Sequence, residues 1–227
     1  MAEERIHFMG AGGQSLVGRV TKPPDDAPHA WALFAHCFTC SKNIAAATRI
    51  SRALAERGFG VLRFDFTGIG ESAGDFADSN FSSNIEDLLA AADWMRSEVR
   101  APRVLIGHSL GGTAALEAAA KIEECVAVAT IGAPARADHV EKLFGRDHDS
   151  IMRDGEATVD LGGRPFNIKR QFIEDLRSHA MPGSLRKLRR AILVMHSPQD
   201  EIVAVENAAE LFQNALHPKS LDRKSVV

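Results

Sequence analysis

Short apolar runs alternate with longer amphipathic segments along this chain of 227 residues. Residues 6–20, interrupted by glycines, are typical of two strands joined by a Gly-rich turn. Apolar runs of strand length follow at 30–35, 60–66, 103–106, 126–131 and 191–195. Helical periodicity separates them, over 44–57, 83–96, 109–124 and 203–216. This alternation predicts an α/β domain with a doubly wound, mostly parallel sheet.

Between residues 135 and 190 the pattern is irregular. It predicts a helical piece over 139–144, a hairpin over 157–168 that turns at Gly162-Gly163, and a helix over 169–178. We interpret residues 135–190 as a small lid inserted into the sheet-forming chain. The length fits one domain, and we assign residues 1–227 to it.

Charge and cysteine content narrow the range of partners. The formal net charge is -3, with acidic and basic residues interspersed, so no basic stripe indicates nucleic-acid binding. The apolar runs are too short for a membrane span, and no signal sequence is evident, so we expect a cytoplasmic protein. Three cysteines do not make a disulfide framework, and we expect reduced thiols. Nothing in the sequence predicts a cofactor or a metal.

The segment Gly107-His108-Ser109-Leu110-Gly111 is a G-x-S-x-G motif between a predicted strand and a predicted Ala-rich helix. This is the context of a nucleophile elbow, in which the serine occupies a strained turn and the glycines avoid steric collision. The alternative is a simple Gly-rich turn or a phosphate-binding loop. The segment has no P-loop lysine, and its glycines do not have G-x-G-x-x-G spacing. We therefore predict that Ser109 is a nucleophile.

The segment His36-Cys37-Phe38 follows a predicted strand and resembles the loop that supplies half of the oxyanion hole in α/β hydrolases. The resemblance implies that the backbone N–H of Phe38 is one oxyanion donor. The second donor would be the N–H of Leu110, at the positive end of a helix. The side chains of His36 and Phe38 would then only pack the loop. The segment that begins at Asp65 resembles the superfamily's D-x-x-G-x-G-x-S loop, which we take as structural.

The third member of a catalytic triad, the acid, is expected after a late strand. Asp200 lies in the loop after residues 191–195 and matches the family pattern. It would orient and stabilise an imidazolium. Two alternatives stay open: Asp200 caps the following helix, or Asp138 is the acid.

Within the α/β-hydrolase superfamily, the chain most resembles the hydrolase part of bacterial proteins that join such a domain to an OsmC-like domain. The resemblance extends to about Ser220 and implies that a final strand and a D-x-x-D-H segment follow. Here the chain turns into residues 221–227 instead, so we expect the final strand to be missing. An open sheet edge would result, and we expect a homodimer to cover it.

A triad base is hard to find in this sequence. His217 alone follows Asp200, and a helix of about 14 residues would carry it to the opposite edge of the sheet, roughly 20 Å away. His139, His148 and His179 lie in the predicted lid, where packing is the usual role. A partner subunit or a separate segment is the remaining source of an imidazole.

Cys37 and Cys40 form a C-x-x-C whose context differs from that of a thioredoxin, and it lacks the further ligands of a zinc motif. We interpret both as ordinary loop residues; a regulatory disulfide is the alternative.

The leading hypothesis for function is a serine hydrolase that cleaves small or medium acyl esters, with weak activity if no histidine completes the triad. The alternative is a truncated or non-catalytic module that binds a ligand.

Overall fold

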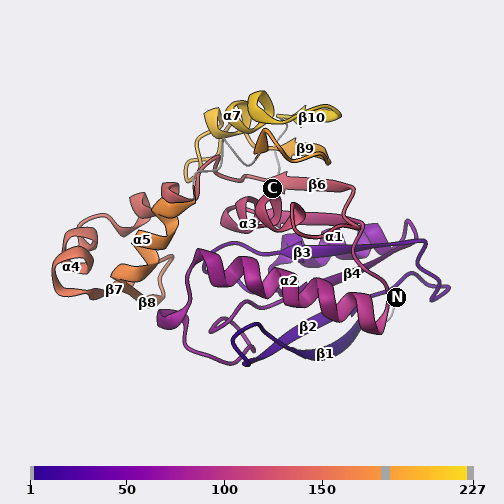
Figure 1. Cartoon of the computed structure of the whole chain (residues 1–227), viewed down its shortest axis with the longest axis horizontal. Helices are drawn as coiled ribbons and strands as arrows, with labels where there is room; N and C mark the ends of the chain where they lie inside the picture. Colours follow the sequence, from indigo (N-terminus) through magenta and orange to yellow (C-terminus); the bar gives the residue numbers. More distant parts are fainter. Residues whose placement is uncertain (1–2, 180–184, 224–227) are drawn as a thin grey trace.

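The computed structural model describes residues 3–179 and 185–223. The main-sheet strands are β1 (Glu3–Met9), β2 (Ser15–Thr21), β3 (Ala30–Ala35), β4 (Phe59–Phe64), β5 (Val104–His108), β6 (Ala127–Ile131), β9 (Ala191–Met195) and β10 (Lys219–Asp222). They form one 8-stranded sheet in the order β1-β2-β4-β3-β5-β6-β9-β10 (Figure 1). β2 pairs antiparallel with β1 and β4, and the other neighbours are parallel.

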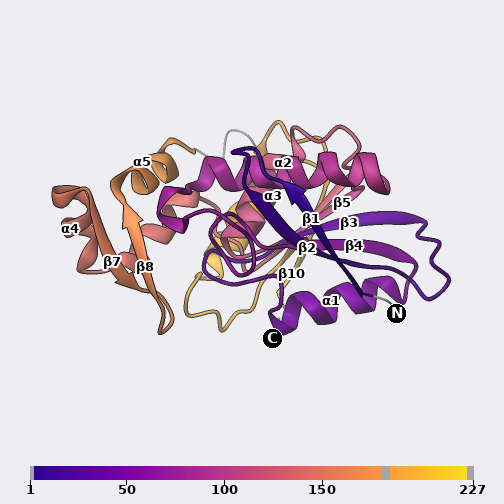
Figure 2. The same cartoon turned by 90° about the horizontal axis from the view of Figure 1, so that it is seen from below.

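Helices cover the sheet on both sides. They are α1 (Ala45–Ala55), α2 (Phe81–Glu98), α3 (Leu110–Ala119) and α7 (Glu206–Asn214). Figure 2 shows α1 on one side of the sheet, with α2 and α3 on the other. The α1 side buries a small cluster around Phe34 and Ile106, whereas the α2–α3 side buries the larger core, to which α7 contributes Leu211. The predicted doubly wound α/β sheet is confirmed, and it has the α/β-hydrolase fold.

The expectation of a missing final strand is wrong. Residues Lys219–Asp222 form β10, which pairs parallel with β9 from Lys219 beside Ile192 to Asp222 beside Met195. Three of its four residues are polar, so no apolar run marks this strand in the sequence. An edge strand pairs with a neighbour on one side only, and it can form without an apolar run. The edge that we expected to be open at β9 is therefore paired, and the reason for expecting a homodimer lapses.

The insertion between β6 and β9 has the predicted hairpin and helix. It contains the 3-10 helix η2 (Ala137–Phe144), α4 (Asp147–Asp154), the hairpin β7 (Glu156–Asp160) and β8 (Pro165–Lys169), and α5 (Arg170–Ser178). The insertion extends away from the sheet at one end of the molecule (Figure 1). The pattern did not predict α4, whose eight residues include one buried side chain, Ile151.

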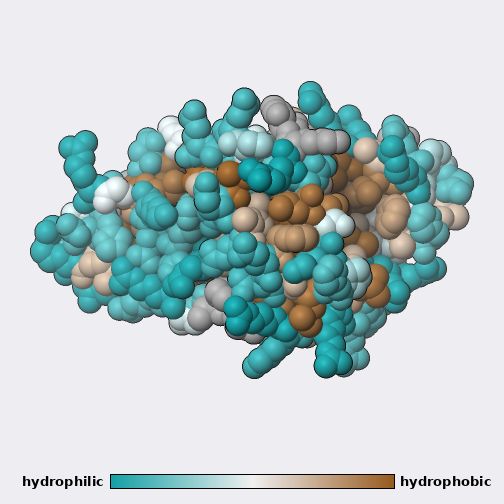
Figure 3. All heavy atoms as spheres, turned by 90° about the horizontal axis from the view of Figure 1, so that it is seen from above, coloured by the Kyte–Doolittle hydropathy of each residue, from teal (hydrophilic) through white to brown (hydrophobic). Residues whose placement is uncertain are grey.

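The face that carries α7, β9 and β10 has apolar side chains gathered near its middle, whereas the insertion beside it is mostly hydrophilic (Figure 3). Leu193 on β9 and Leu216, shortly after α7, are both exposed. None of the described helices is long and apolar enough to cross a membrane.

Candidate active site

Ser109 occupies a strained turn between β5 and α3. Its φ of 52° and ψ of -131° are unusual for a residue with a side chain. The Ser109 amide donates to the carbonyl of Ile131 on β6 at 2.9 Å, which anchors the turn to the neighbouring strand. A non-glycine residue in this conformation marks a site that the surrounding fold holds in place.

The two glycines of the motif have a steric purpose. A Cβ on Gly107 would lie 2.3 Å from the carbonyl oxygen of Gly111, within the turn itself. A Cβ on Gly111 would lie 2.1 Å from the carbonyl oxygen of His36, in the loop after β3. Gly111 therefore lets the start of α3 approach the loop that contains Phe38.

Phe38 and Leu110 line one small cavity of about 10 Å³, together with Phe66, Phe76 and Ala114 among others. A cavity of this size holds about one water molecule. In the described part of the chain, neither the Phe38 amide nor the Leu110 amide donates to a backbone or side-chain acceptor. Leu110 is also the first residue of α3, where the helix dipole is positive. The geometry leaves both N–H groups available to a ligand.

A buried ion pair holds the loop after β3, which we define as residues 36–43. Lys42 and Asp65 are both fully buried, and Lys42 Nζ lies 2.5 Å from Asp65 Oδ2. Lys42 Nζ also contacts Glu71 at 2.7 Å, and Asp65 accepts the Lys42 and Glu71 amides at 2.6 and 3.0 Å. Asp65 thus joins this loop to the loop after β4, a structural role. Lys42 could not be identified from the sequence, because no local pattern marks a lone lysine as buried.

His36 is a second buried support of this loop. Its Nδ1 donates to the carbonyl of Cys37 at 2.7 Å, and its Nε2 accepts the Phe66 amide at 3.3 Å. Burial is the main cause that lowers its pKa to about 4, against smaller raising effects. The ring is neutral near pH 7, so its 4.0 Å approach to Asp65 is not an ion pair. His36 packs and positions the loop.

Asp200 lies in the loop after β9, two strands from Ser109. Its Oδ1 accepts the backbone amides of Ile202 and Val203 at 3.0 and 2.8 Å, so the carboxylate caps a turn. Its Oδ2 lies 3.5 Å from Nε2 of buried His196, which in turn contacts the carbonyl of Val203 at 2.7 Å. Oδ2 also lies 3.1 Å from the Cβ position of Gly132. The structure brings Asp200 to the same edge of the sheet as Ser109, with one carboxylate oxygen outside the cap.

Asp138, the alternative candidate for the triad acid, has a different partner. It is bound to Arg136 at 2.6 Å, and that hydrogen bond is the main cause that lowers its pKa. The contact is a local ion pair at the start of η2. It gives Asp138 no connection to Ser109.

The described residues place no histidine in hydrogen-bond contact with Ser109. His148 contacts Glu141 within the insertion at 3.2 Å. His179 joins the insertion to the main domain, because it contacts Glu117 of α3 at 3.0 Å and Ser82 of α2 at 2.9 Å. His139 approaches the Asp200 loop, with Nε2 3.3 Å from the Ile202 carbonyl. His217 precedes Pro218, whose carbonyl accepts the Ile192 amide near the amino end of β9, away from the elbow.

The expectation of reduced thiols is wrong for two of the three cysteines. Cys37 and Cys40 form a disulfide with a Cα–Cα distance of 5.3 Å, well within the usual range. The loop turns between them, with the Cys40 amide donating to the Cys37 carbonyl at 3.2 Å, and this turn brings the side chains together. Cys125 is free and buried.

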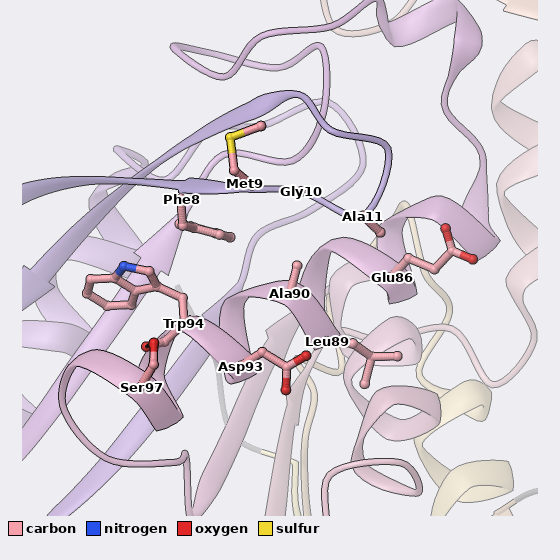
Figure 4. Close-up of a pocket in the computed structure, with 10 residues that line it drawn as sticks. All are labelled: Phe8, Met9, Gly10, Ala11, Glu86, Leu89, Ala90, Asp93, Trp94 and Ser97. Atoms are coloured by element: carbon pink, nitrogen blue, oxygen red, sulfur yellow. Dashed lines mark hydrogen bonds between the residues drawn. The ribbon is translucent and has the colours of Figure 1, made fainter.

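A separate hollow of about 590 Å³ lies between the β1–β2 turn and α2. Figure 4 shows Phe8 and Met9 on one side, with Glu86, Leu89 and Trp94 of α2 on the other. It shares no lining residue with the cavity beside Leu110. Its residues include no nucleophile beside a base, so the elbow is the better candidate.

Comparison with known proteins agrees with this geometry. Residues 29–217 match the model of the Alpha/beta hydrolase family. The chain belongs to this family. The esterase domain of a Rhodothermus marinus protein is 49% identical, with a TM-score of 0.80, covering 98% of this chain and 88% of that domain.

Two more distant proteins are also similar to this chain. Est1E from Butyrivibrio proteoclasticus, solved with ferulic acid bound, superimposes with a TM-score of 0.85 at 21% identity, over 96% of this chain and 88% of its own. The mouse mitochondrial palmitoyl-protein thioesterase ABHD10 is 25% identical over 82% of this chain and 64% of its own length. The chain therefore spans less than two thirds of that relative. Together these findings describe an esterase-like or thioesterase-like α/β hydrolase.

Proposed function

We propose that this alpha/beta hydrolase cleaves carboxylic esters of small or medium acyl groups through an acyl-enzyme on Ser109. The observation that carries the proposal is the strained Ser109 elbow beside the unpartnered N–H groups of Phe38 and Leu110. The esterase domain from Rhodothermus marinus, 49% identical, supports the same reaction class.

The reaction follows from these groups. Ser109 Oγ attacks the acyl carbonyl while its proton passes to a base. The carbonyl oxygen becomes negative and accepts hydrogen bonds from the N–H groups of Phe38 and Leu110. The C–O bond to the alcohol breaks, and the alcohol leaves with the proton. Water then attacks the acyl-enzyme, which releases the carboxylic acid and restores the serine. Asp200 Oδ2 is the group that would orient the base.

Aromatic side chains of the insertion form the wall on which we expect acyl size to depend. The Phe38 ring lies 4.9 Å from the ring of Phe172 and 5.4 Å from that of Phe76. Phe76 in turn contacts Phe166 at 4.9 Å. We therefore assign the insertion the role of a lid over the acyl site. Phe172→Ala should raise the hexanoate-to-acetate rate ratio for p-nitrophenyl esters, and an unchanged ratio would contradict this assignment.

The decisive experiment compares the purified chain with Ser109→Ala in the hydrolysis of p-nitrophenyl acetate and butyrate from pH 6 to 9. We expect a Ser109-dependent rate. Serine proteases that lack a triad member still accelerate hydrolysis roughly 10³- to 10⁴-fold over the reaction in water, through their oxyanion donors and substrate binding. We therefore expect a weak rate even without a histidine. An inflection near the ordinary histidine pKa of about 6.5 would show that an imidazole reaches the site. Equal rates for the two proteins would refute the proposal.

The second candidate function is a hydrolase-like binding module. The observation in its favour is that none of the described histidines contacts Ser109. His139→Ala separates the cases further, because His139 approaches the Asp200 loop whereas His179 does not. A rate that falls in His139→Ala but not in His179→Ala would identify His139 as the base.

A further inference from the structure

The residues before Ser109 and before Phe38 lie side by side. β3 and β5 pair in parallel with Ala35 beside Gly107, so His108, the last residue of β5, lies next to the start of the loop after β3. The sulfur atoms of Cys37 and Cys40 and a ring nitrogen of His108 all lie within 4.8 Å of one another. Two sulfurs and an imidazole nitrogen are a donor set for a thiophilic divalent cation such as Zn²⁺.

His108 provides a second, independent observation. Its Nδ1 is buried and has no hydrogen-bond partner in the described structure. A buried polar atom without a partner is costly, and a bound ligand is one explanation for keeping it. The side chain is not needed for the elbow itself, which depends on backbone and glycine.

We propose that Cys37, Cys40 and His108 form a thiol-gated site for a divalent cation of the Zn²⁺ class. In the disulfide form the sulfurs are bonded to each other and the site is closed. A dithiol reductant breaks the S–S bond, takes up the oxidising equivalents as its own disulfide, and leaves two thiols. The cation then displaces two protons to solvent and binds two thiolates and the imidazole.

The expected geometry fits the distances. Tetrahedral Zn²⁺ with sulfur at about 2.3 Å and nitrogen at about 2.0 Å places its donors roughly 3.5 to 4 Å apart. The donors already lie within 4.8 Å, so reduction requires the sulfurs to separate but no movement of β5. Two thiolates neutralise the ion, and all three residues are partly exposed, so solvent and reductant can reach them. Three protein donors leave a fourth position for water or an anion.

Metal binding by the whole chain tests the proposal without reference to catalysis. The protein is reduced with dithiothreitol, desalted without oxygen, and titrated with Co²⁺ while thiolate-to-cobalt absorption in the near ultraviolet is recorded. We expect one ion per reduced chain, displacement by Zn²⁺, and no such absorption for the oxidised chain. Ser109→Ala keeps all three donors and should bind equally, so failure of the esterase proposal would leave this one standing.

Variants assign the donors. Cys37→Ser and Cys40→Ser should lose the thiolate–cobalt absorption. His108→Ala should weaken cobalt binding by at least about tenfold. If circular dichroism shows that His108→Ala folds poorly, His108→Gln takes its place. The matched controls are Cys125→Ser, a buried thiol outside the cluster, and His148→Ala, and both should bind as the wild type does. Absence of thiolate–cobalt absorption in the reduced wild type, or unchanged affinity in a folded His108 variant, would overturn the proposal.

Discussion

The loop after β3 is fixed by buried contacts on several sides, whereas the loop after β9, residues 196–203, is held mainly by contacts among its own residues. The first contains fully buried Lys42, and a glycine of α3 packs directly on its backbone. The second is capped by Asp200 and leaves Ile202 64% exposed. The oxyanion side is therefore tied to the rest of the fold by buried contacts, while the acid side is a local turn in which Asp200 Oδ2 lies outside the cap, 3.5 Å from His196 Nε2.

This difference explains which part of the site is easier to recognise. Steric constraints allow only glycine at 107 and 111, so the sequence itself carries the constraint. An aspartate in a short loop satisfies a turn whether or not it also serves catalysis. Four changes test the contrast, from the largest expected effect to the smallest.

Lys42→Met should destabilise the fold most. It leaves the buried Asp65 carboxylate without its cation, and breaking such a pair costs about 3–5 kcal/mol of unfolding free energy. Arg96→Met is the matched control, because the Arg96–Glu124 pair is 44% and 35% exposed and contributes no more than about 1 kcal/mol. Urea denaturation measures both, and similar losses would contradict a rigid oxyanion loop.

Gly111→Ala should cost about 1–3 kcal/mol, because its Cβ would collide with the His36 carbonyl at 2.1 Å and neither backbone can yield freely. The melting temperature should fall by about 2–4 °C for each kcal/mol. Gly12→Ala is the control, since the nearest atoms there belong to the flexible end of Gln14. A melting temperature equal to that of the control would show that the elbow is looser than described.

Asp200→Asn should lower ester hydrolysis by at least about tenfold, with little change in stability. The amide keeps an oxygen for the Ile202 and Val203 N–H groups but loses the charge that stabilises an imidazolium. Steady-state rates are measured beside the melting temperature. A rate within twofold of the wild type would leave Asp200 as a turn cap only.

Low pH should lower the stability of the fold through His36, in the loop after β3. Its folded pKa of about 4 lies below the ordinary 6.5, so the unfolded chain binds more protons between these values. Stability therefore falls as the pH drops through this window, by less than about 1 kcal/mol between pH 7 and pH 6. His36→Gln removes this titration, so its stability should depend less on pH than that of the wild type. Identical pH profiles would contradict a neutral buried ring.

The sequence predicted the fold from periodicity, and the misses have physical causes. The pattern of 203–216 suggested a long helix, but α7 spans only Glu206–Asn214. The helix expected over 83–96 begins earlier, at Phe81, because Asn80 and Ser83 form a capping box at its start. β10 was missed because Leu221 is its one apolar residue. Long-range contacts such as Lys42 with Asp65 leave no local pattern.

For the site, Ser109 lies in the strained strand-to-helix turn that the motif predicted, and Phe38 and Leu110 line one cavity. The catalytic roles of all three stay predictions. The disulfide was missed because C-x-x-C spacing is compatible with thiols, a bridge or a metal, and the choice depends on the turn between the cysteines. The relation of Asp200 to Ser109 needed the sheet order, since β6 separates their strands.

Covalent labelling of Ser109 tests the central claim most directly. The chain is treated with a fluorophosphonate, digested, and analysed by peptide mass spectrometry beside Ser109→Ala. We expect one phosphonyl adduct, on the peptide that contains Ser109, and none in the variant. No adduct, or an adduct on another serine that persists in Ser109→Ala, would contradict the assignment of Ser109 as the nucleophile.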